Sequence, residues 1–277
     1  MLGLRQAQAE REQRNSGVRQ RLFIFGLGYT AARIADAASA RGWEVVSTGS
    51  AGTLAFEDHG GVRLALADSD QVLSSVPPAA DGDPVLELYG DALADKPLTY
   101  LSSTGVYGDC GGAWVDESAA TGSGRRTARS EADAEWLKRG ARVLRLPGIY
   151  GPGRSALDRV REGRAQRIDL PGQVFSRVHV DDIVSGALLA LGAPPGAYNI
   201  ADDLPASQNA VIEAASALLG IEPPPLLSLE AARLSPQARA FYDENRRVAN
   251  AKAKRVLGWK LRSPTYREGL RSLLPAR

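Results

Sequence analysis

Short apolar runs alternate with helix-like segments in the first half of the chain. The run LFIF at 22–25 ends at Gly26, and apolar residues at helical spacing follow it up to Gly42. The next stretch, WEVVST at 43–48, is typical of a second strand. A strand, a helix and a strand in this order predict a βαβ unit with parallel strands.

Four further apolar runs predict more strands of the same sheet. They lie at 62–66, 71–76, 98–103 and 142–147. Helix-compatible stretches separate several of them, which favours a doubly wound parallel sheet. The connection at 67–70 is too short for a crossover helix, which needs about a dozen residues, and the pattern offers no account of that shortage.

The pattern changes after residue 150. A charged helical segment is predicted at about 155–164. Residues typical of helix starts and ends mark the later helices: Ser207, Gly220, Ser235, Pro236 and Gly258.

Composition and charge place the chain among ordinary globular proteins. Of its 277 residues, 44% are hydrophobic and 24% are charged, and the formal net charge is +2. This balance provides no concentrated basic face for nucleic acid, and no apolar run approaches the roughly 18 residues of a membrane helix. Cys110 is the only cysteine, so an internal disulfide is impossible, which favours a cytoplasmic location. We expect neither a nucleic acid nor a membrane as partner, and no metal site.

The first strand meets the first helix in a glycine loop, GLGYTA. Gly26 permits the tight turn, and Gly28 lets backbone amides approach a diphosphate that the helix N-terminus stabilises. Ala31 stands where the fingerprint has its third glycine and needs only a small side chain. The loop, with Tyr29 and Thr30, therefore predicts a dinucleotide site; the alternative is a βα turn without a ligand.

The end of the second strand bears on the choice of dinucleotide. An NAD site usually has an acidic residue there for the ribose 2′-hydroxyl, but this stretch reads VVSTGS. Thr48 and Ser50 could donate to a 2′-phosphate without repelling it, which favours NADP over NAD. The arginine that often binds this phosphate is also absent.

Three consecutive hydroxyl residues, Ser102, Ser103 and Thr104, follow the apolar part of the 98–103 run. Side chains at the carboxyl end of a parallel strand face the crevice where doubly wound sheets bind ligands. We expect these hydroxyls to lie beside the nicotinamide. The alternative is that they only cap the following turn.

Six ordered blocks, spread from about residue 22 to residue 273, resemble the extended short-chain dehydrogenase/reductase family. Within it they resemble the NAD-dependent epimerase/dehydratase group and its atypical bacterial members. The blocks are GLGYTA, YLSSTGVYGD, RLPGIYGPG, RVHVDDI, YNIADD and PTYREGL. The resemblance implies that Ser103 is the catalytic hydroxyl, with Thr104 beside it, and that a homodimer is possible.

The resemblance also implies further contacts. It assigns six residues of two loops to the cofactor: Ser75, Val76, Pro77, Pro147, Gly148 and Ile149. Tyr107, Tyr150 and Arg177 are expected at the substrate, the arginine as an anchor for an anion, while aromatic residues there more often form walls than act as acids. His179 could titrate near neutrality or be structural, with Asp181 and Asp182 as the cap and first turn of a helix.

The chain departs from the resembled family in one respect. Active members carry a Tyr-x-x-x-Lys pair, and the resemblance places Thr127 at the tyrosine and Glu131 at the lysine. A phenol needs its pKa lowered by about three units to act near pH 7, usually by a neighbouring cation. Threonine is far less acidic, and Glu131 would oppose an anion, so the usual proton relay cannot operate.

Three hypotheses follow. The first is an NADP-dependent oxidoreductase or epimerase-like enzyme for a small carbonyl or sugar-like substrate, with Ser103 or Thr104 at the reacting oxygen. The second is an inactive dinucleotide-binding sensor or interaction protein. The third is a fold that binds another nucleotide or none.

The expected architecture is α/β, a doubly wound Rossmann sheet with a smaller interleaved C-terminal α/β lobe. Residues 22–150 would form the dinucleotide-binding domain, to which 177–203 returns. Residues 151–176 and 204–277 would form the smaller substrate lobe. The arginine-rich stretch 1–21 lacks the apolar segment of a signal peptide and is predicted to be a flexible tail.

Overall fold

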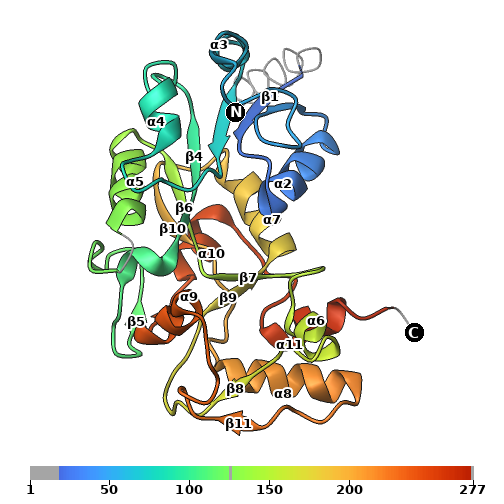
Figure 1. Cartoon of the computed structure of the whole chain (residues 1–277). Coiled ribbons are helices and arrows are strands. Elements are labelled where there is room, and N and C mark those ends of the chain that lie inside the picture. Colours follow the sequence, from blue (N-terminus) through green and yellow to red (C-terminus); the bar gives the residue numbers. More distant parts are fainter. Residues whose placement is uncertain (1–18, 125–126, 276–277) are drawn as a thin grey trace, which may run out of the picture.

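A six-stranded parallel sheet lies at the centre of the structure, a computed structural model that describes residues 19–124 and 127–275 (Figure 1). The strand order is β10-β6-β4-β3-β1-β2. The strands are β1 (Arg21–Phe25), β2 (Glu44–Ser47), β3 (Gln71–Ser74), β4 (Leu98–Ser103), β6 (Arg142–Leu146) and β10 (Gly196–Asn199). The doubly wound sheet expected from the sequence is confirmed. Of the predicted tail, residues 1–18 lie outside the described residues.

β1 is buried on both faces, which explains its uninterrupted apolar sequence. Leu22 and Ile24 belong to one core cluster, whereas Phe23 and Phe25 belong to another, because successive side chains of a strand point to opposite faces. The first cluster includes residues of α2 (Tyr29–Ser39), α7 (Val180–Ala190) and α10 (Ala251–Leu257), and the second includes residues of α3 (His59–Ala67), α4 (Pro84–Tyr89) and α5 (Thr127–Lys138).

The predicted strand at 62–66 is wrong, because these residues belong to helix α3. Val62 and Leu66 are fully buried one helical turn apart, while Leu64 between them is 69% exposed. Alternating apolar residues suit a strand as well as they suit four residues of a helix, and only burial distinguishes the two. Helix α3 is therefore the crossover between β2 and β3, which accounts for the short connection at 67–70.

β1 pairs with β2 on one side and with β3 on the other. The chain leaves β1 toward one edge of the sheet and returns to the opposite side through α3. Such a switch point opens a crevice at the carboxyl ends of the strands, where α/β sheets bind ligands. The glycine loop after β1 lies at this point.

The remaining elements gather beyond the carboxyl ends of the sheet strands, in the lower half of Figure 1. Around one core cluster pack α6 (Ala156–Arg161), α8 (Gln208–Leu219) and α11 (Tyr266–Ser272). The short elements are η1 (Thr104–Tyr107), α9 (Pro236–Arg239), η2 (Ala240–Asp243) and three parallel strand pairs, namely β7 (Gly148–Tyr150) with β9 (Arg177–His179), β8 (Arg167–Ile168) with β11 (Leu226–Leu227), and β5 (Trp114–Val115) with β12 (Arg247–Val248).

The helix ends predicted in this part of the chain are confirmed. The side chains of Ser207 and Ser235 cap α8 and α9, and Gly220 and Gly258 end α8 and α10 in the left-handed conformation. The exact bounds of the two expected domains stay a prediction. In the described ranges no helix combines the length and apolar character that crossing a bilayer requires.

Candidate active site

The glycine loop leaves an open space at the N-terminus of α2. Gly26 has φ +79°, and a Cβ there would come within 2.9 Å of the Val76 side chain. Gly28 is the N-cap of α2, with no side-chain hydrogen bond to the helix and no acidic residue in the first turn. A Cβ at Gly28 would meet nothing within 4 Å. The amides of the first turn can therefore bind an anion such as a diphosphate.

Two predicted cofactor contacts instead hold this loop in place. The Gly26 amide donates to Thr48 Oγ1 over 3.2 Å, and the Ser75 hydroxyl donates to the Gly26 carbonyl. Thr48 is only 1% exposed, so its hydroxyl lies beneath the loop and not at a ribose phosphate. Ser50 is exposed, so Ser50 and the missing acidic residue are the features that still favour NADP.

Tyr29, another predicted cofactor contact, joins α2 to the segment after β7. Its hydroxyl donates to the Pro152 carbonyl over 3.1 Å. The guanidinium groups of Arg33 and Arg154 lie 5.4 Å and 4.9 Å from the centre of its ring. The tyrosine thus connects the glycine loop to the second half of the chain. Thr30 and Ala31 follow it in the first turn of the helix.

The three hydroxyls at the end of β4 have different surroundings. The buried Ser102 hydroxyl donates to Asp133 Oδ2 over 2.6 Å. Ser103 Oγ accepts from the Gly105 amide over 3.1 Å and so caps η1, yet Ser103 and Thr104 also line a cavity. A hydroxyl that accepts one hydrogen bond can still donate its own hydrogen to a ligand. Both predicted roles of Ser103, cap and site residue, are therefore compatible with its position.

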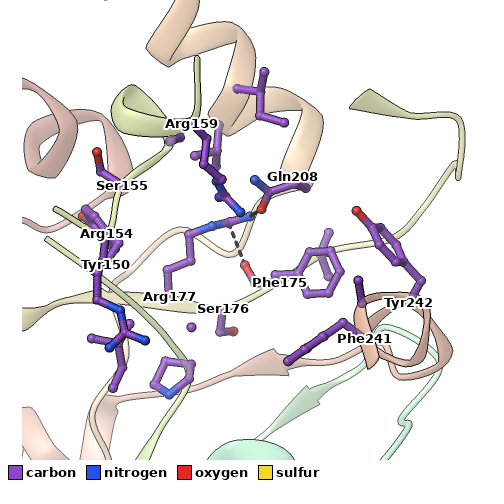
Figure 2. Close-up of a pocket in the computed structure, with 18 of the residues that line it drawn as sticks. Tyr150, Arg154, Ser155, Arg159, Phe175, Ser176, Arg177, Gln208, Phe241 and Tyr242 are labelled. Carbon is purple, nitrogen blue, oxygen red and sulfur yellow. Dashed lines mark hydrogen bonds between the residues drawn. The ribbon is translucent and has the colours of Figure 1, made fainter. Parts of the chain in front are cut away.

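The cavity has a volume of about 900 Å³ and lies between the end of β4 and the helices α6 and α8. Figure 2 shows part of its lining. Seven of the predicted site residues line it: Ser103, Thr104, Pro147, Gly148, Ile149, Tyr150 and Arg177. The far side of the cavity was not predicted from the sequence and includes Arg159, Phe175, Gln208 and Tyr242. Nothing in the sequence separates Arg159 from the other arginines of its charged segment.

Arg177 is deeply buried in the cavity wall, at 6% exposure. Its Nη1 donates to the carbonyls of Phe175 and Ala206, each over 2.9 Å, and it forms no ion pair within the described residues. Burial lowers its pKa to about 10, so the side chain is still a cation at neutral pH. The charge of the buried Asp202 acts on Arg177 without forming an ion pair with it, and a buried cation without a paired carboxylate fits the predicted anchor for an anion.

His179 caps a helix. Its Nδ1 accepts from the Asp181 amide over 3.2 Å at the start of α7, so the predicted cap at Asp181 is wrong, although Asp181 and Asp182 both lie in the first turn. The imidazole packs edge-on against the ring of Tyr150, with the ring centres 5.2 Å apart. Burial lowers the pKa of His179. These contacts favour the structural alternative over a substrate contact.

Tyr107 also lies apart from the cavity wall, and its side chain is 1% exposed. Its hydroxyl donates to Asn199 Oδ1 over 2.8 Å and accepts from Arg145 Nη1 over 3.0 Å. Arg145 in turn forms a buried ion pair with Asp133 at 2.7 Å. The expected substrate contact of Tyr107 therefore has no support from its position, which is that of a core hydrogen-bonding residue.

Thr127 and Glu131 both lie exposed on the first turns of α5. The buried residues of this helix are Ser130, Ala132, Asp133 and Trp136. Neither the Thr127 nor the Glu131 side chain carries a phenol or an amine. At these two positions the chain therefore differs from the resembled family, as the sequence indicates.

Three features define the class of this protein. They are the glycine loop at the switch point of the sheet, the hydroxyl residues at the end of β4, and the cavity between β4 and the helices α6 and α8. The chain is a Rossmann protein with the fold of the NAD-dependent epimerases and dehydratases. No protein-family model matches the sequence.

Comparison with known proteins agrees with this class. A solved structure of a functionally unknown conserved protein from Silicibacter pomeroyi is 37% identical and covers 92% of this chain and 98% of its own, with a TM-score of 0.82. The chain belongs to the same family as that protein. Protein YeeZ of Escherichia coli K12 is 29% identical over 241 residues, which is 74% of this chain and 86% of YeeZ.

A more distant structure shares the fold. The human epimerase family protein SDR39U1, solved with NADPH, is 18% identical, with a TM-score of 0.72 over 92% of this chain and 98% of its own. At this identity the likeness concerns the fold.

Proposed function

We propose that the protein is an NADP(H)-dependent oxidoreductase or epimerase-like enzyme that acts on a small carbonyl or sugar-like substrate. The observation that carries the proposal is the uncapped N-terminus of α2, which faces open space at Gly28. The NADPH in the SDR39U1 structure of the same fold supports this choice of cofactor. The cavity beside Ser103 provides room for a substrate.

The residues of this chain divide the work of binding. The amides of Tyr29, Thr30 and Ala31 would bind the diphosphate, and the loops at 75–77 and 147–149 would border the rest of the cofactor. NADP(H) would donate or accept the hydride. The Ser103 hydroxyl would donate a hydrogen bond to the reacting oxygen of the substrate, because it lines the cavity at the carboxyl end of β4.

A second candidate function is dinucleotide binding without turnover. Thr127 and Glu131 favour it, because neither side chain can act as the acid that the resembled family places on this helix. The cavity lined by Ser103 favours the enzyme instead. The two functions share the cofactor and differ in turnover.

Titration of the full chain with NADPH, NADH and adenine nucleotides, followed by calorimetry, is the first test. Binding of NADPH in preference to the others is expected, and failure of every dinucleotide to bind would contradict both candidates. NADPH oxidation is then measured with a panel of carbonyl compounds. Turnover in the unmodified protein excludes the second candidate.

A double variant, Thr127→Tyr with Glu131→Lys, separates the candidates further. Both positions are exposed, so the fold should tolerate the change. If the unmodified protein is inactive and the variant oxidises NADPH, loss of the catalytic pair explains the inactivity. Equal turnover in both proteins would show that the enzyme uses a different proton donor.

A further inference from the structure

On one wall of the cavity the predicted anchor Arg177 meets a second cation and an amide that were not predicted from the sequence. Arg159 extends from α6, Arg177 from β9, and Gln208 from the first turn of α8. Figure 2 shows the guanidinium ends of both arginines converging beside the Gln208 side chain. Burial is the main cause of the lowered pKa of Arg177, the charge of Asp202 opposes it, and the charge of Arg159 lowers this pKa further.

Among the described residues no carboxylate forms an ion pair with either arginine, although the charge of the buried Asp202, which does not line the cavity, raises the pKa of Arg177. Arg159 makes no side-chain hydrogen bond or ion pair within the part of the chain that the structure describes, and Arg177 bonds only to two backbone carbonyls and the Gln208 oxygen. Burial lowers the pKa of Arg159, but a guanidinium stays charged in proteins. Like charges held together at a partly dry site favour a bound anion.

The other charges of the cavity wall are already engaged. Among the described residues, the wall contains five arginines and two acidic residues. The engaged groups are Arg154 over the ring of Tyr29, Arg164 with Glu162, Arg246 with Glu244, and Asp158 with Ser155 and Arg161. No described acidic residue of the wall therefore compensates the positive charge of Arg159 and Arg177.

Gln208 adds an unused donor at the same place. Its Oε1 accepts from Arg177 Nη2 over 3.4 Å, which directs the amide nitrogen away from that arginine. This Nε2 is buried and has no hydrogen-bond partner within the described residues. Buried donors are seldom left unpaired, so an acceptor on a ligand would complete the site.

Next to this polar group lies an aromatic wall. The rings of Phe175 and Tyr242 pack edge-on with their centres 5.6 Å apart, and both line the cavity. The charge of Arg159 acts on the Tyr242 hydroxyl and opposes the rise in its pKa that burial causes. Val211 and Ile212 of α8 continue the apolar lining. A ligand that fits here has an anionic end and an apolar, preferably planar, body.

We propose that Arg159, Arg177 and Gln208 bind an oxyanion group, a carboxylate or a phosphate, of a substrate whose apolar body lies against Phe175 and Tyr242. The inference rests on the proposed function only in that the ligand is taken to be the substrate reacting at the Ser103 end of the cavity. The anion site itself needs no dinucleotide.

Calorimetric titration of the full chain with benzoate and with phenyl phosphate tests the proposal and distinguishes a carboxylate site from a phosphate site. We expect at least one of the two to bind. Arg159→Gln should weaken that binding about tenfold or more. Arg164→Gln is the matched control, because this arginine lies on the same wall but is paired with Glu162, and it should change the affinity by no more than about twofold.

Gln208→Glu provides a second variant that keeps the size of the side chain. Its carboxylate would pair with the two arginines, so the fold should persist while binding of either probe is lost. Absence of binding to the unmodified protein, or binding that survives in Arg159→Gln or in Gln208→Glu, would overturn the proposal. NADPH affinity is measured on the same samples. If the unmodified protein binds a probe but not NADPH, the proposed function alone is contradicted. If it binds NADPH but neither probe, the anion site alone is contradicted.

Discussion

The carboxylate of Asp133 on α5 lies 2.7 Å from the guanidinium of Arg145 on β6, and both side chains are almost fully buried. Arg145 Nε also donates to Asp133 over 3.1 Å, so the pair is bidentate. The Ser102 hydroxyl at the end of β4 donates to the same carboxylate. The ion pair thus connects α5 to the two strands nearest the candidate site.

Removal of the carboxylate should destabilise the fold, because the Arg145 cation would remain buried without its partner. Asp133→Ala leaves the Arg145 cation buried without its carboxylate, and we expect the free energy of unfolding to fall by about 3–5 kcal/mol. Chemical denaturation measures the change. Glu135→Ala is the control on the same helix, since it breaks surface pairs with Lys138 at 3.3 Å and with Arg139 at 3.6 Å and should have little effect. Equal losses in the two variants would contradict this account.

The acid Asp202 predicts a dependence of stability on pH. Its side chain is 1% exposed, and burial raises its pKa to about 7. The folded protein then holds a proton that the unfolded chain has released between about pH 4 and pH 7, so stability falls as pH rises through this window. Above about pH 7 the contribution of Asp202 to the free energy of unfolding no longer changes with pH.

Asp202→Asn removes this titration. We expect the variant to be more stable than the unmodified protein at pH 8, by at most about 4 kcal/mol, since one pKa unit corresponds to about 1.4 kcal/mol. The difference should shrink toward pH 4. Denaturation of both proteins at several pH values measures it, and the other titrating groups are common to both. A difference that does not vary with pH would show that Asp202 is not the responsible group.

Gly28→Asp tests the diphosphate site directly. The backbone at Gly28 is extended with φ −88°, and a Cβ there meets nothing within 4 Å, so the variant should fold. Its carboxylate would repel a diphosphate at the N-terminus of α2 and weaken NADPH binding about tenfold or more. Gly192→Asp is the control, because it adds a carboxylate at another open position. Unchanged NADPH affinity in Gly28→Asp would place the cofactor elsewhere.

Ser103→Ala tests the reacting-oxygen contact. Loss of one hydrogen bond to the reacting oxygen should lower kcat/KM about a hundredfold or more, with NADPH affinity unchanged. Ser103→Thr keeps both the hydroxyl and the cap on η1 and should retain most of the activity. If the two variants lose activity equally, the hydroxyl has no direct part in the reaction and Ser103 acts only as the cap.

The local sequence predicts a structural element correctly where its pattern is compatible with a single conformation. LFIF predicts a strand buried on both faces, and Phe23 and Ile24 do face opposite clusters. GLGYTA requires glycine at Gly26 for its positive φ. Helix caps such as Ser207 are equally local, because a hydroxyl needs only the amides of the next turn.

The tertiary structure decided what depends on contacts distant in sequence. The apolar pattern of α3 fits a strand equally well, because only packing distinguishes the buried Val62 from the exposed Leu64. Asp133 and Arg145 form an ion pair because α5 packs beside β6, and their spacing in the sequence does not predict this contact. Arg177 was expected as an anion anchor, but nothing in the sequence distinguishes Arg159, and folding brings both to one side of a cavity where no described carboxylate forms an ion pair with them.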